Sequence, residues 1–414
     1  MLILIMIDGL SADYMASSSA RLPHLQQLRE QGFYVESLEA DVPATSLPGR
    51  SSIITGVDSS VHGIYGNIIW DGSLFRYANP DDVRVPTLPR RALEAGLDVA
   101  VLGYGMVRPE DASVFHHPWW ANEMLQRARD LEPIPADESW LRAARHRDSS
   151  GRLAALAAAG LADSIPDAYS GQGDTKYLQY LAAGLTGDQT MLQWSAGLAS
   201  STTPPDLLLT EILIPDSVQH LAGYKNPIAH WSLSYADSLV GTLLTQLERA
   251  GVLEQSTLVI TSDHGHGTIE RALHPHNILP ELPMSCEGGF LYVALDSPED
   301  APRMHELLAP YGVSQHDGSH LPTEQRQHIA CFLAPAGTSF EQASPGDASP
   351  QGAPRYRSGH GFIPGSLSDQ RFAIFYGAGV PIEYCPQARS GQLTPTMAQL
   401  LGLSLDPYPD TPLW

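Results

Sequence analysis

Short apolar runs recur along the whole chain, and they show no alternation between hydrophobic and polar positions. They span Leu2 to Ile7, Val99 to Leu102, Leu207 to Ile214, Leu258 to Thr261, Phe290 to Ala294 and Phe372 to Tyr376. Continuous hydrophobicity of this length is typical of strands that are buried on both faces, as in a parallel sheet covered by helices. We therefore expect these runs to be strands of a parallel sheet.

Helical patterns lie between the strands. Leucines recur at helical spacing over Leu22 to Leu28 and again over Leu239 to Leu247. Strands that alternate with helices predict an α/β fold with a doubly wound, mostly parallel central sheet flanked by helices.

Two stretches interrupt this alternation and predict the domain organisation. Residues 107–205 contain several tryptophans, an Ala-rich run and Gly-rich joints, and we interpret them as an inserted cap. Residues 266–365 mix two strand-like runs with a loop rich in Pro, Ser and Gly, and we interpret them as a second, irregular insertion. The core is then expected to consist of residues 1–106, 206–265 and 366–414.

Composition narrows the class of partner. A net charge of -22 over 414 residues argues against binding to a nucleic acid polymer, which needs a cationic surface. A small anionic substrate is still compatible if metals or local cations reverse the field where it binds. The sequence does not specify an oligomeric state.

The compartment is predicted from cysteines and apolar segments. Cys286, Cys331 and Cys385 are odd in number and far apart, which favours a reducing compartment. The seven-residue apolar start lacks a basic flank and runs directly into Asp8, so it predicts a buried strand and not a signal peptide. No apolar run has membrane-spanning length. We expect a cytoplasmic protein with no membrane partner.

Carboxylates and imidazoles follow several of the expected strands. Asp8 follows the first strand, Asp216 opens D-S-V-Q-H with His220 four residues later, and Asp263 and His264 stand in S-D-H-G; His360 lies in S-G-H-G-F. Any one of these residues alone is more often a turn or cap residue. Because ligands collect at the carboxyl edge of a parallel sheet, the set together predicts sites for zinc or a similar divalent metal.

The segment T-S-L-P-G-R-S-S-I-I-T-G, residues 45–56, places Ser46 at a helix start, since Pro48 suits a first helical turn. A serine there is often only a helix cap. A helix N-terminus also binds anions, and a metal shared with Asp8, Asp263 and His264 would activate the hydroxyl as a nucleophile.

These motifs together resemble the alkaline phosphatase superfamily, and within it the nucleotide pyrophosphatase/phosphodiesterase branch. The resemblance rests on I-D-G, P-A-T-S-L-P-G-R-S-S-I-I-T-G, V-H-G-I-Y-G-N, D-S-V-Q-H, S-D-H-G and G-H-G-F, in the order of the family and over nearly the whole chain. It implies a phosphoric ester hydrolase, of phosphodiesterase or nucleotide pyrophosphatase type, that acts on a small-molecule phosphoester.

The resemblance also implies roles for single residues. Ser46 aligns with the nucleophile and with a ligand of one metal, together with Asp8, Asp263 and His264. Asp216, His220 and His360 align with the ligands of a second metal. Asn67 matches the asparagine whose amide binds a phosphoryl oxygen. Two divalent ions are implied, with zinc favoured and manganese compatible. Their charge of +4, three carboxylates and a Ser46 alkoxide would sum to zero.

Two related activities are alternatives. S-L-P-G-R also fits the sulfatase pattern, in which Ser46 would be oxidised to formylglycine, although Gly9 stands where sulfatases have a second Asp. A phosphonoacetate hydrolase shares the metal site but would use cap lysines, and the region here offers only Arg108. A non-enzymatic binding protein is disfavoured because no ligand position is lost.

Some residues have two open interpretations. Arg50 departs from the family, which has a His at this position, and it either supports the phosphoryl site or faces solvent. Tyr65, Trp70 and Tyr104 are candidates for stacking on a nucleobase, but core packing is favoured for each.

Overall fold

The computed structural model describes residues 1–17, 19–121, 146–159, 175–279, 281–365 and 368–414. Its centre is a nine-stranded sheet in which five neighbouring strands, β9, β1, β8, β5 and β6, are parallel. The strand order across this sheet is β20 (Glu383–Ala388), β2 (Phe33–Leu38), β19 (Arg371–Gly377), β9 (Thr257–Thr261), β1 (Leu2–Ile7), β8 (Leu207–Ile212), β5 (Val99–Leu102), β6 (Val114–His116) and β7 (His146–Asp148).

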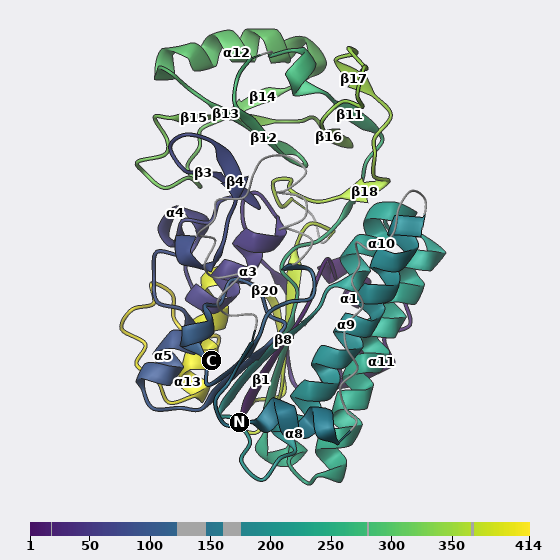
Figure 1. The fold of residues 1–414 in the computed structure, drawn as a ribbon, viewed down its shortest axis with the longest axis vertical. Helices are drawn as coiled ribbons and strands as arrows, with labels where there is room; N and C mark the ends of the chain where they lie inside the picture. The colour runs from purple at the N-terminus through teal and green to yellow at the C-terminus, as the bar shows by residue number, and fades with distance from the viewer. Residues whose placement is uncertain (18, 122–145, 160–174, 280, 366–367) are drawn as a thin grey trace.

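Helices cover both faces of this sheet (Figure 1). One face carries α2 (Pro23–Gln31), α9 (Thr175–Ala199), α10 (Ile214–Ala222) and α11 (Pro227–Arg249), and the other carries α3 (Ser46–Thr55), α5 (Leu88–Glu94) and α13 (Leu393–Leu400). Strand β1 shows why its sequence is continuously apolar: Leu2, Leu4 and Met6 enter one core, whereas Ile3, Ile5 and Ile7 enter the other. The predicted α/β fold is confirmed.

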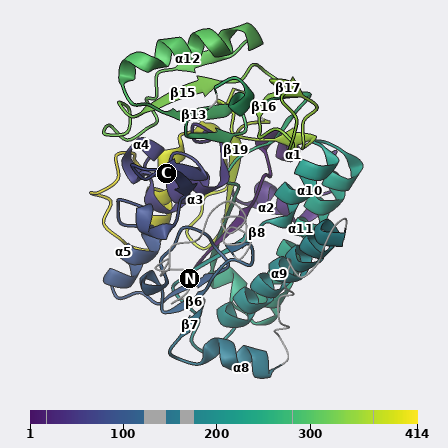
Figure 2. The same ribbon diagram turned by 45° about the horizontal axis from the view of Figure 1, so that its top comes forward.

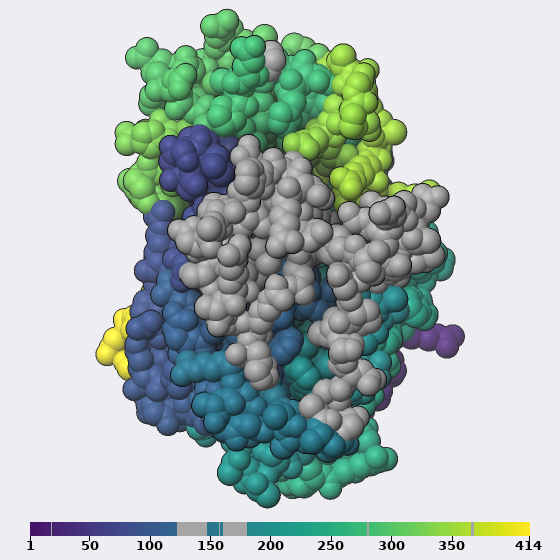
Figure 3. All heavy atoms as spheres, viewed as in Figure 1, coloured from purple at the N-terminus to yellow at the C-terminus, as the bar shows by residue number. Residues whose placement is uncertain are grey.

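A second body is built mainly from residues 267–359. It contains a four-stranded antiparallel sheet, β12 (Met284–Glu287), β13 (Phe290–Ala294), β15 (Ile329–Leu333) and β14 (Ser314–His316), covered by α12 (Ala301–Leu308). A three-stranded sheet of β16 (Thr338–Phe340), β11 (Arg271–Leu273) and β17 (Gln351–Gly352) adjoins it, and β18 (Ser358–Gly359) pairs with β10 (Gly267–Thr268). Figures 1 and 2 place this body above the large sheet, and Figure 3 shows it as the green and yellow-green region at the top of the molecule.

Smaller elements complete the described chain. The helices are α1 (Ala12–Ala16), α4 (Ser59–His62) and α8 (Arg152–Ala158), and a hairpin is formed by β3 (Ile68–Trp70) and β4 (Phe75–Tyr77). Among the described helices, none combines the length and the apolarity needed to cross a bilayer. All three cysteines are free thiols.

The structure corrects three details of the strand prediction. Phe290–Ala294 lies in the antiparallel sheet of the second body, where apolar residues are buried between that sheet and its own helix. Strand β19, predicted as parallel, pairs antiparallel with both β9 and β2. Strand β8 ends at Ile212, because Ile214 already begins α10.

The described part of the predicted cap belongs to the large sheet and to the helices that cover it. Strands β6 and β7 extend the large sheet, and α9 packs against β8 and α11. The boundary predicted at residue 107 therefore passes through the sheet. The rest of the predicted cap, residues 122–145 and 160–174, lies outside the described residues.

Candidate active site

Three neighbouring parallel strands bring the predicted site residues to one edge of the sheet. Asp8 directly follows β1, Asp263 and His264 follow β9, and Asp216 lies in the first turn of α10 just beyond β8. The Nε2 atom of His264 is 3.3 Å from Asp8 Oδ1. Their roles as metal ligands stay predictions, but the structure places their side chains together.

Asp216, His220 and His360 form one group of potential ligands. Their nearest donor atoms lie within 4.8 Å of one another. His220 follows Asp216 by one helical turn, with 3.4 Å between Nε2 and Oδ2, and His360 Nε2 is 3.7 Å from Asp216 Oδ1. The structure therefore brings together the three residues that the family resemblance implies for one metal, and their role as ligands stays a prediction.

A second group shares a member with the first. Asp8, Asp216 and His264 also lie within 4.8 Å of one another, so Asp216 lies within reach of both groups. Asp263 was predicted as a ligand here, but its Oδ2 accepts a hydrogen bond from Arg50, and its Oδ1 accepts from the backbone N–H groups of Gly9 and His264. Both carboxylate oxygens of Asp263 are therefore engaged, and Asp263 is not among the residues that line the cleft.

Backbone carbonyls orient two of the histidines. Nδ1 of His264 donates to Gly265 O at 2.8 Å, and Nδ1 of His220 donates to Ser358 O at 2.8 Å. Because a carbonyl only accepts, each ring must carry its proton on Nδ1, which leaves the Nε2 lone pair for a ligand. Burial also lowers the pKa of His264 and of His360, which favours their neutral, ligating form.

Buried polar atoms without hydrogen-bond partners and shifted pKa values indicate whether a cation fits the candidate metal site. Asp8 Oδ1 is buried without a hydrogen-bond partner. Burial and then the charge of Asp263 raise the pKa of Asp8 well above its usual value. Burial also opposes ionisation of Asp216, yet His220, His266 and His360 hold the pKa of that carboxyl well below its usual range. Divalent cations would satisfy these groups, so the residues fit a metal centre.

Ser46 is the first residue of α3, and Thr45 is its N-cap. The Ser46 hydroxyl does not cap the helix; it lies 3.0 Å from His264 Nε2. A Cβ at Gly49 would lie 2.3 Å from the carbonyl oxygen of Asp263, so glycine permits this close approach of the helix to the β9 loop. Ser46 thus combines a helix N-terminus with contact to the cluster of potential ligands.

Asn67 lies beside Ser46 in the same cleft. The cleft has a volume of about 740 Å³ and is lined by both bodies of the protein. Asn67 Oδ1 accepts a hydrogen bond from the backbone N–H of Leu47 at 2.8 Å. Because the oxygen is engaged, the Nδ2 group is the part of this carboxamide that remains to donate to a ligand.

Arg50 is buried at the base of the site, with 1% of its side chain exposed. Its guanidinium donates to Asp8 at 2.5 Å, to Asp263 at 2.7 Å and to Glu211 at 3.0 Å, and it lies over the ring of Trp120. Burial opposes its charge, but the carboxylates, Glu211 first, raise the pKa of Arg50 above its usual value. Of the two interpretations left open by the sequence, exposure to solvent is wrong.

Sequence reasoning missed three buried groups. His266 Nε2 lies 2.7 Å from Asp216 Oδ1, and its signal was a second histidine in S-D-H-G-H-G. Glu211 interrupts the apolar run of β8, which was an available signal because an unpaired charge is rarely buried. Glu287 lies far away in the sequence in an ordinary β-hairpin, and it carried no local signal.

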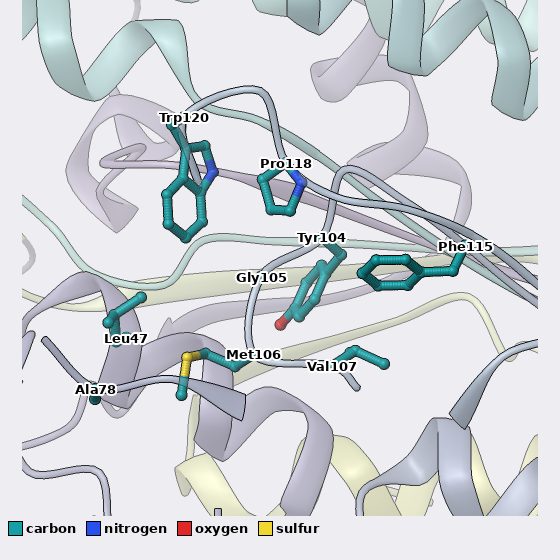
Figure 4. Close-up of a pocket in the computed structure, with 9 residues that line it drawn as sticks. All are labelled: Leu47, Ala78, Tyr104, Gly105, Met106, Val107, Phe115, Pro118 and Trp120. Atoms are coloured by element: carbon teal, nitrogen blue, oxygen red, sulfur yellow. The ribbon is translucent and has the colours of Figure 1, made fainter. Parts of the chain in front are cut away.

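The aromatic candidates for nucleobase stacking are core residues or lie outside the cleft lining. Tyr65 and Tyr104 are fully buried, and Trp70 packs against Phe75. Figure 4 shows Tyr104 among apolar side chains around a cavity of about 10 Å³. That volume is no larger than a single water requires, so this cavity is a packing defect and not a ligand site.

Comparison with known proteins identifies the family. A family model described as type I phosphodiesterase/nucleotide pyrophosphatase matches residues 2–343. The chain therefore belongs to this family, within the alkaline phosphatase superfamily.

Individual relatives are distant. Human bis(5'-adenosyl)-triphosphatase ENPP4 is 23% identical over 64% of this chain and 47% of its own length, and rat ectonucleotide pyrophosphatase/phosphodiesterase family member 3 is 20% identical over 68% and 26%. The chain thus matches about half or less of these relatives. The structure of murine ectonucleotide pyrophosphatase/phosphodiesterase 5 is similar in fold, with a TM-score of 0.70, 14% identity and coverage of 97% of this chain and 95% of that one.

Proposed function

We propose that this protein is a metal-dependent phosphodiesterase or nucleotide pyrophosphatase that uses Ser46 as nucleophile and two divalent metals. The observation that carries the proposal is the position of the Ser46 hydroxyl. It lies at a helix N-terminus, 3.0 Å from His264 Nε2, beside two groups of potential ligands that share Asp216. Family membership supports the same reaction class.

The residues of the site have complementary roles in this reaction. Divalent ions held by the two groups, zinc or manganese, would lower the pKa of the Ser46 hydroxyl and stabilise charge on the transferring phosphoryl group. Ser46 Oγ attacks phosphorus, the bond to the leaving oxygen breaks, and a phosphoseryl diester forms. Asn67 Nδ2 donates to a nonbridging oxygen. Water then attacks phosphorus, which releases the phosphomonoester and restores Ser46.

Nucleotide esters are the proposed substrate class. One similar protein is named as a bis(5'-adenosyl)-triphosphatase, and an inactive variant of murine phosphodiesterase 5 was solved in complex with AMP. A phosphonoacetate hydrolase would use cap lysines, and Arg108, which the corresponding region offers instead, pairs with Asp81 at 3.0 Å and does not line the cleft. Arg108 therefore gives no support for a substrate that carries a carboxylate.

Metal analysis combined with a substrate panel tests this proposal. We expect two transition-metal ions per chain, loss of activity with chelator, and recovery with zinc or manganese. The panel contains bis-p-nitrophenyl phosphate, p-nitrophenyl phosphate and p-nitrophenyl sulfate. A single calcium ion together with preferred hydrolysis of the sulfate would overturn the proposal and favour a sulfatase.

A further inference from the structure

Glu287 is a buried carboxylate that holds the backbone of the Asn67 segment. It ends strand β12 of the second body, with 5% of its side chain exposed. One carboxylate oxygen accepts from the N–H of Asn67 at 2.9 Å, and the other accepts from the N–H of Ile68 at 2.9 Å. Two successive peptide groups are therefore fixed by a single side chain.

A second hydrogen bond links Asn67 to the segment that carries the nucleophile. The Asn67 carboxamide accepts from the backbone N–H of Leu47, the residue that follows Ser46. Glu287 sets the backbone position of Asn67, and Leu47 sets the rotation of its carboxamide. Asn67 and Ser46 both line the cleft, so these two contacts fix the carboxamide in the cleft that contains the nucleophile.

The hairpin that carries Glu287 is itself held against the His360 loop. A Cβ at Gly288, whose φ is +66°, would lie 1.9 Å from the carbonyl oxygen of His360. A Cβ at Gly361, whose φ is +84°, would lie 2.0 Å from the carbonyl oxygen of Glu287. Both contacts are too close for any residue but glycine. Glu287 is thus anchored next to a predicted metal ligand while it holds Asn67.

A carboxylate is well suited to hold two successive peptide groups in place. Burial of an ionisable group is costly, and neutral acceptors satisfy most backbone N–H groups in folded proteins. A carboxylate, however, accepts from two adjacent N–H groups at once and makes stronger, more directional hydrogen bonds. That geometry suits a segment whose side chain must be held within about half an ångström.

We propose that Glu287 is a positioning residue that fixes the Asn67 carboxamide over Ser46, and this inference rests on the proposed function of the site. Displacement of a transition-state donor by about 1 Å costs roughly 10²-fold in rate. The second body therefore contributes to catalysis through the placement of Asn67 as well as through His360.

A double-mutant cycle with bis-p-nitrophenyl phosphate tests the inference. The variant Glu287→Gln keeps the size of the side chain but replaces one acceptor oxygen with an amide donor. We expect kcat/KM to fall about 10- to 100-fold, mainly in kcat, with unchanged metal content. Asn67→Ala should fall by roughly 10²-fold. In the Asn67→Ala background, Glu287→Gln should change kcat/KM by less than about threefold, because the group that it positions is gone.

Asp237→Asn is the matched control. Asp237 is a buried carboxylate that accepts from the successive N–H groups of His24 and Leu25, at 3.2 and 2.8 Å, on the helical layer outside the cleft. This variant loses the same kind of hydrogen bond, so it should lose stability without a change in kcat/KM. If Glu287→Gln does not fold, Glu287→Asp keeps the carboxylate on a shorter side chain and should show the same coupling.

The outcomes separate this inference from the proposed function. Independent, multiplicative losses from Glu287→Gln and Asn67→Ala would overturn the positioning role, as would a Glu287→Gln variant with wild-type kcat/KM. A wild-type protein that hydrolyses no phosphodiester with zinc or manganese would overturn the proposed function, and with it this inference.

Discussion

The guanidinium of Arg50 and the carboxylate of Asp263 are joined by a hydrogen bond of 2.7 Å between Nη1 and Oδ2. The same guanidinium binds Asp8 Oδ2, so both aspartates direct their Oδ2 atoms toward a buried cation. Asp8 thereby keeps Oδ1 for the cleft. Glu211 balances the charge of Arg50, and the pair adds no net charge to the site.

Arg50→Ala should destabilise the metal-free protein by about 3–5 kcal/mol, since it leaves three buried carboxylates without their counter-charge. Chemical unfolding in the presence of chelator measures this loss. Saturating zinc should recover part of it, because a cation at Asp8 compensates the same charges. The control Arg84→Ala removes an ion pair with Glu324 that is exposed on both sides, and it should cost less than about 1 kcal/mol. Equal stability of the metal-free Arg50→Ala and wild-type proteins would contradict this account.

Ser46→Ala should remove the activity while it preserves the fold. Loss of a catalytic nucleophile reduces kcat by about 10³-fold or more, whereas the helix keeps Thr45 as its N-cap and loses less than about 1 kcal/mol. Steady-state kinetics and thermal unfolding check the two parts. Ser46→Thr retains a hydroxyl and should retain part of the turnover. Substantial activity in Ser46→Ala would instead point to direct attack by water.

The sequence predicted the core of the fold because its signals were local. Buried parallel strands such as β1 are apolar at every position, and a residue that follows such a strand must lie at the edge of the sheet. Asp8, Asp216 and His264 could therefore be placed together without a structure. The periodicity of Phe290–Ala294 gave no information about which sheet this strand joins, since any strand buried on both faces has the same pattern.

The rest of the site depends on tertiary contacts that leave no trace in the local sequence. Glu287 contacts Asn67 although the two residues are 220 positions apart in the sequence, and Glu211 contacts Arg50 at a separation of 161 positions. The hydrogen bond between Arg50 and Asp263 was also not predictable. The motif S-D-H-G indicates a metal ligand regardless of which residue stands at position 50. Motifs identified which residues approach the site, whereas side-chain pairing determined how each is used.

The titration of Glu287 should make stability depend on pH. Burial raises the pKa of this carboxyl from 4.5 to about 7 in the folded protein. Between these values the unfolded chain releases the proton while the folded protein keeps it. The contribution to stability is therefore fully present below pH 4.5 and is lost as the pH rises through 7. This loss amounts to at most roughly 3 kcal/mol.

Glu287→Gln cannot titrate, so it isolates this contribution from those of other groups. The free energy of unfolding of Glu287→Gln, minus that of the wild type, should rise between pH 5 and pH 8. Urea unfolding at several pH values in metal-free buffer measures the difference. A difference that stays constant over this range would mean that Glu287 does not titrate there.

Diesters should be hydrolysed with a higher kcat/KM than monoesters or sulfates. With two divalent ions, the carboxylates of Asp8, Asp216 and Asp263 and a Ser46 alkoxide sum to zero charge, and the Arg50–Glu211 pair leaves this sum unchanged. A monoester brings roughly two negative charges and a diester brings one. The charge of a diester is therefore the better match.

The lining of the cleft reinforces this preference. Glu287 and Glu341 also line it, and Arg355, a second arginine of the lining, lies against Tyr356 with its backbone N–H bound to Glu341. Among the described lining residues, the carboxylates of Glu287 and Glu341 therefore oppose the positive charge of Arg355, and little net positive charge is left for an additional phosphate charge. Comparison of bis-p-nitrophenyl phosphate with p-nitrophenyl phosphate, at saturating zinc, should show kcat/KM higher for the diester by about tenfold, the equivalent of roughly 1.4 kcal/mol. Faster hydrolysis of the monoester would mean that Arg355 supplies a cation to the dianion, and it would reverse the assignment of substrate class.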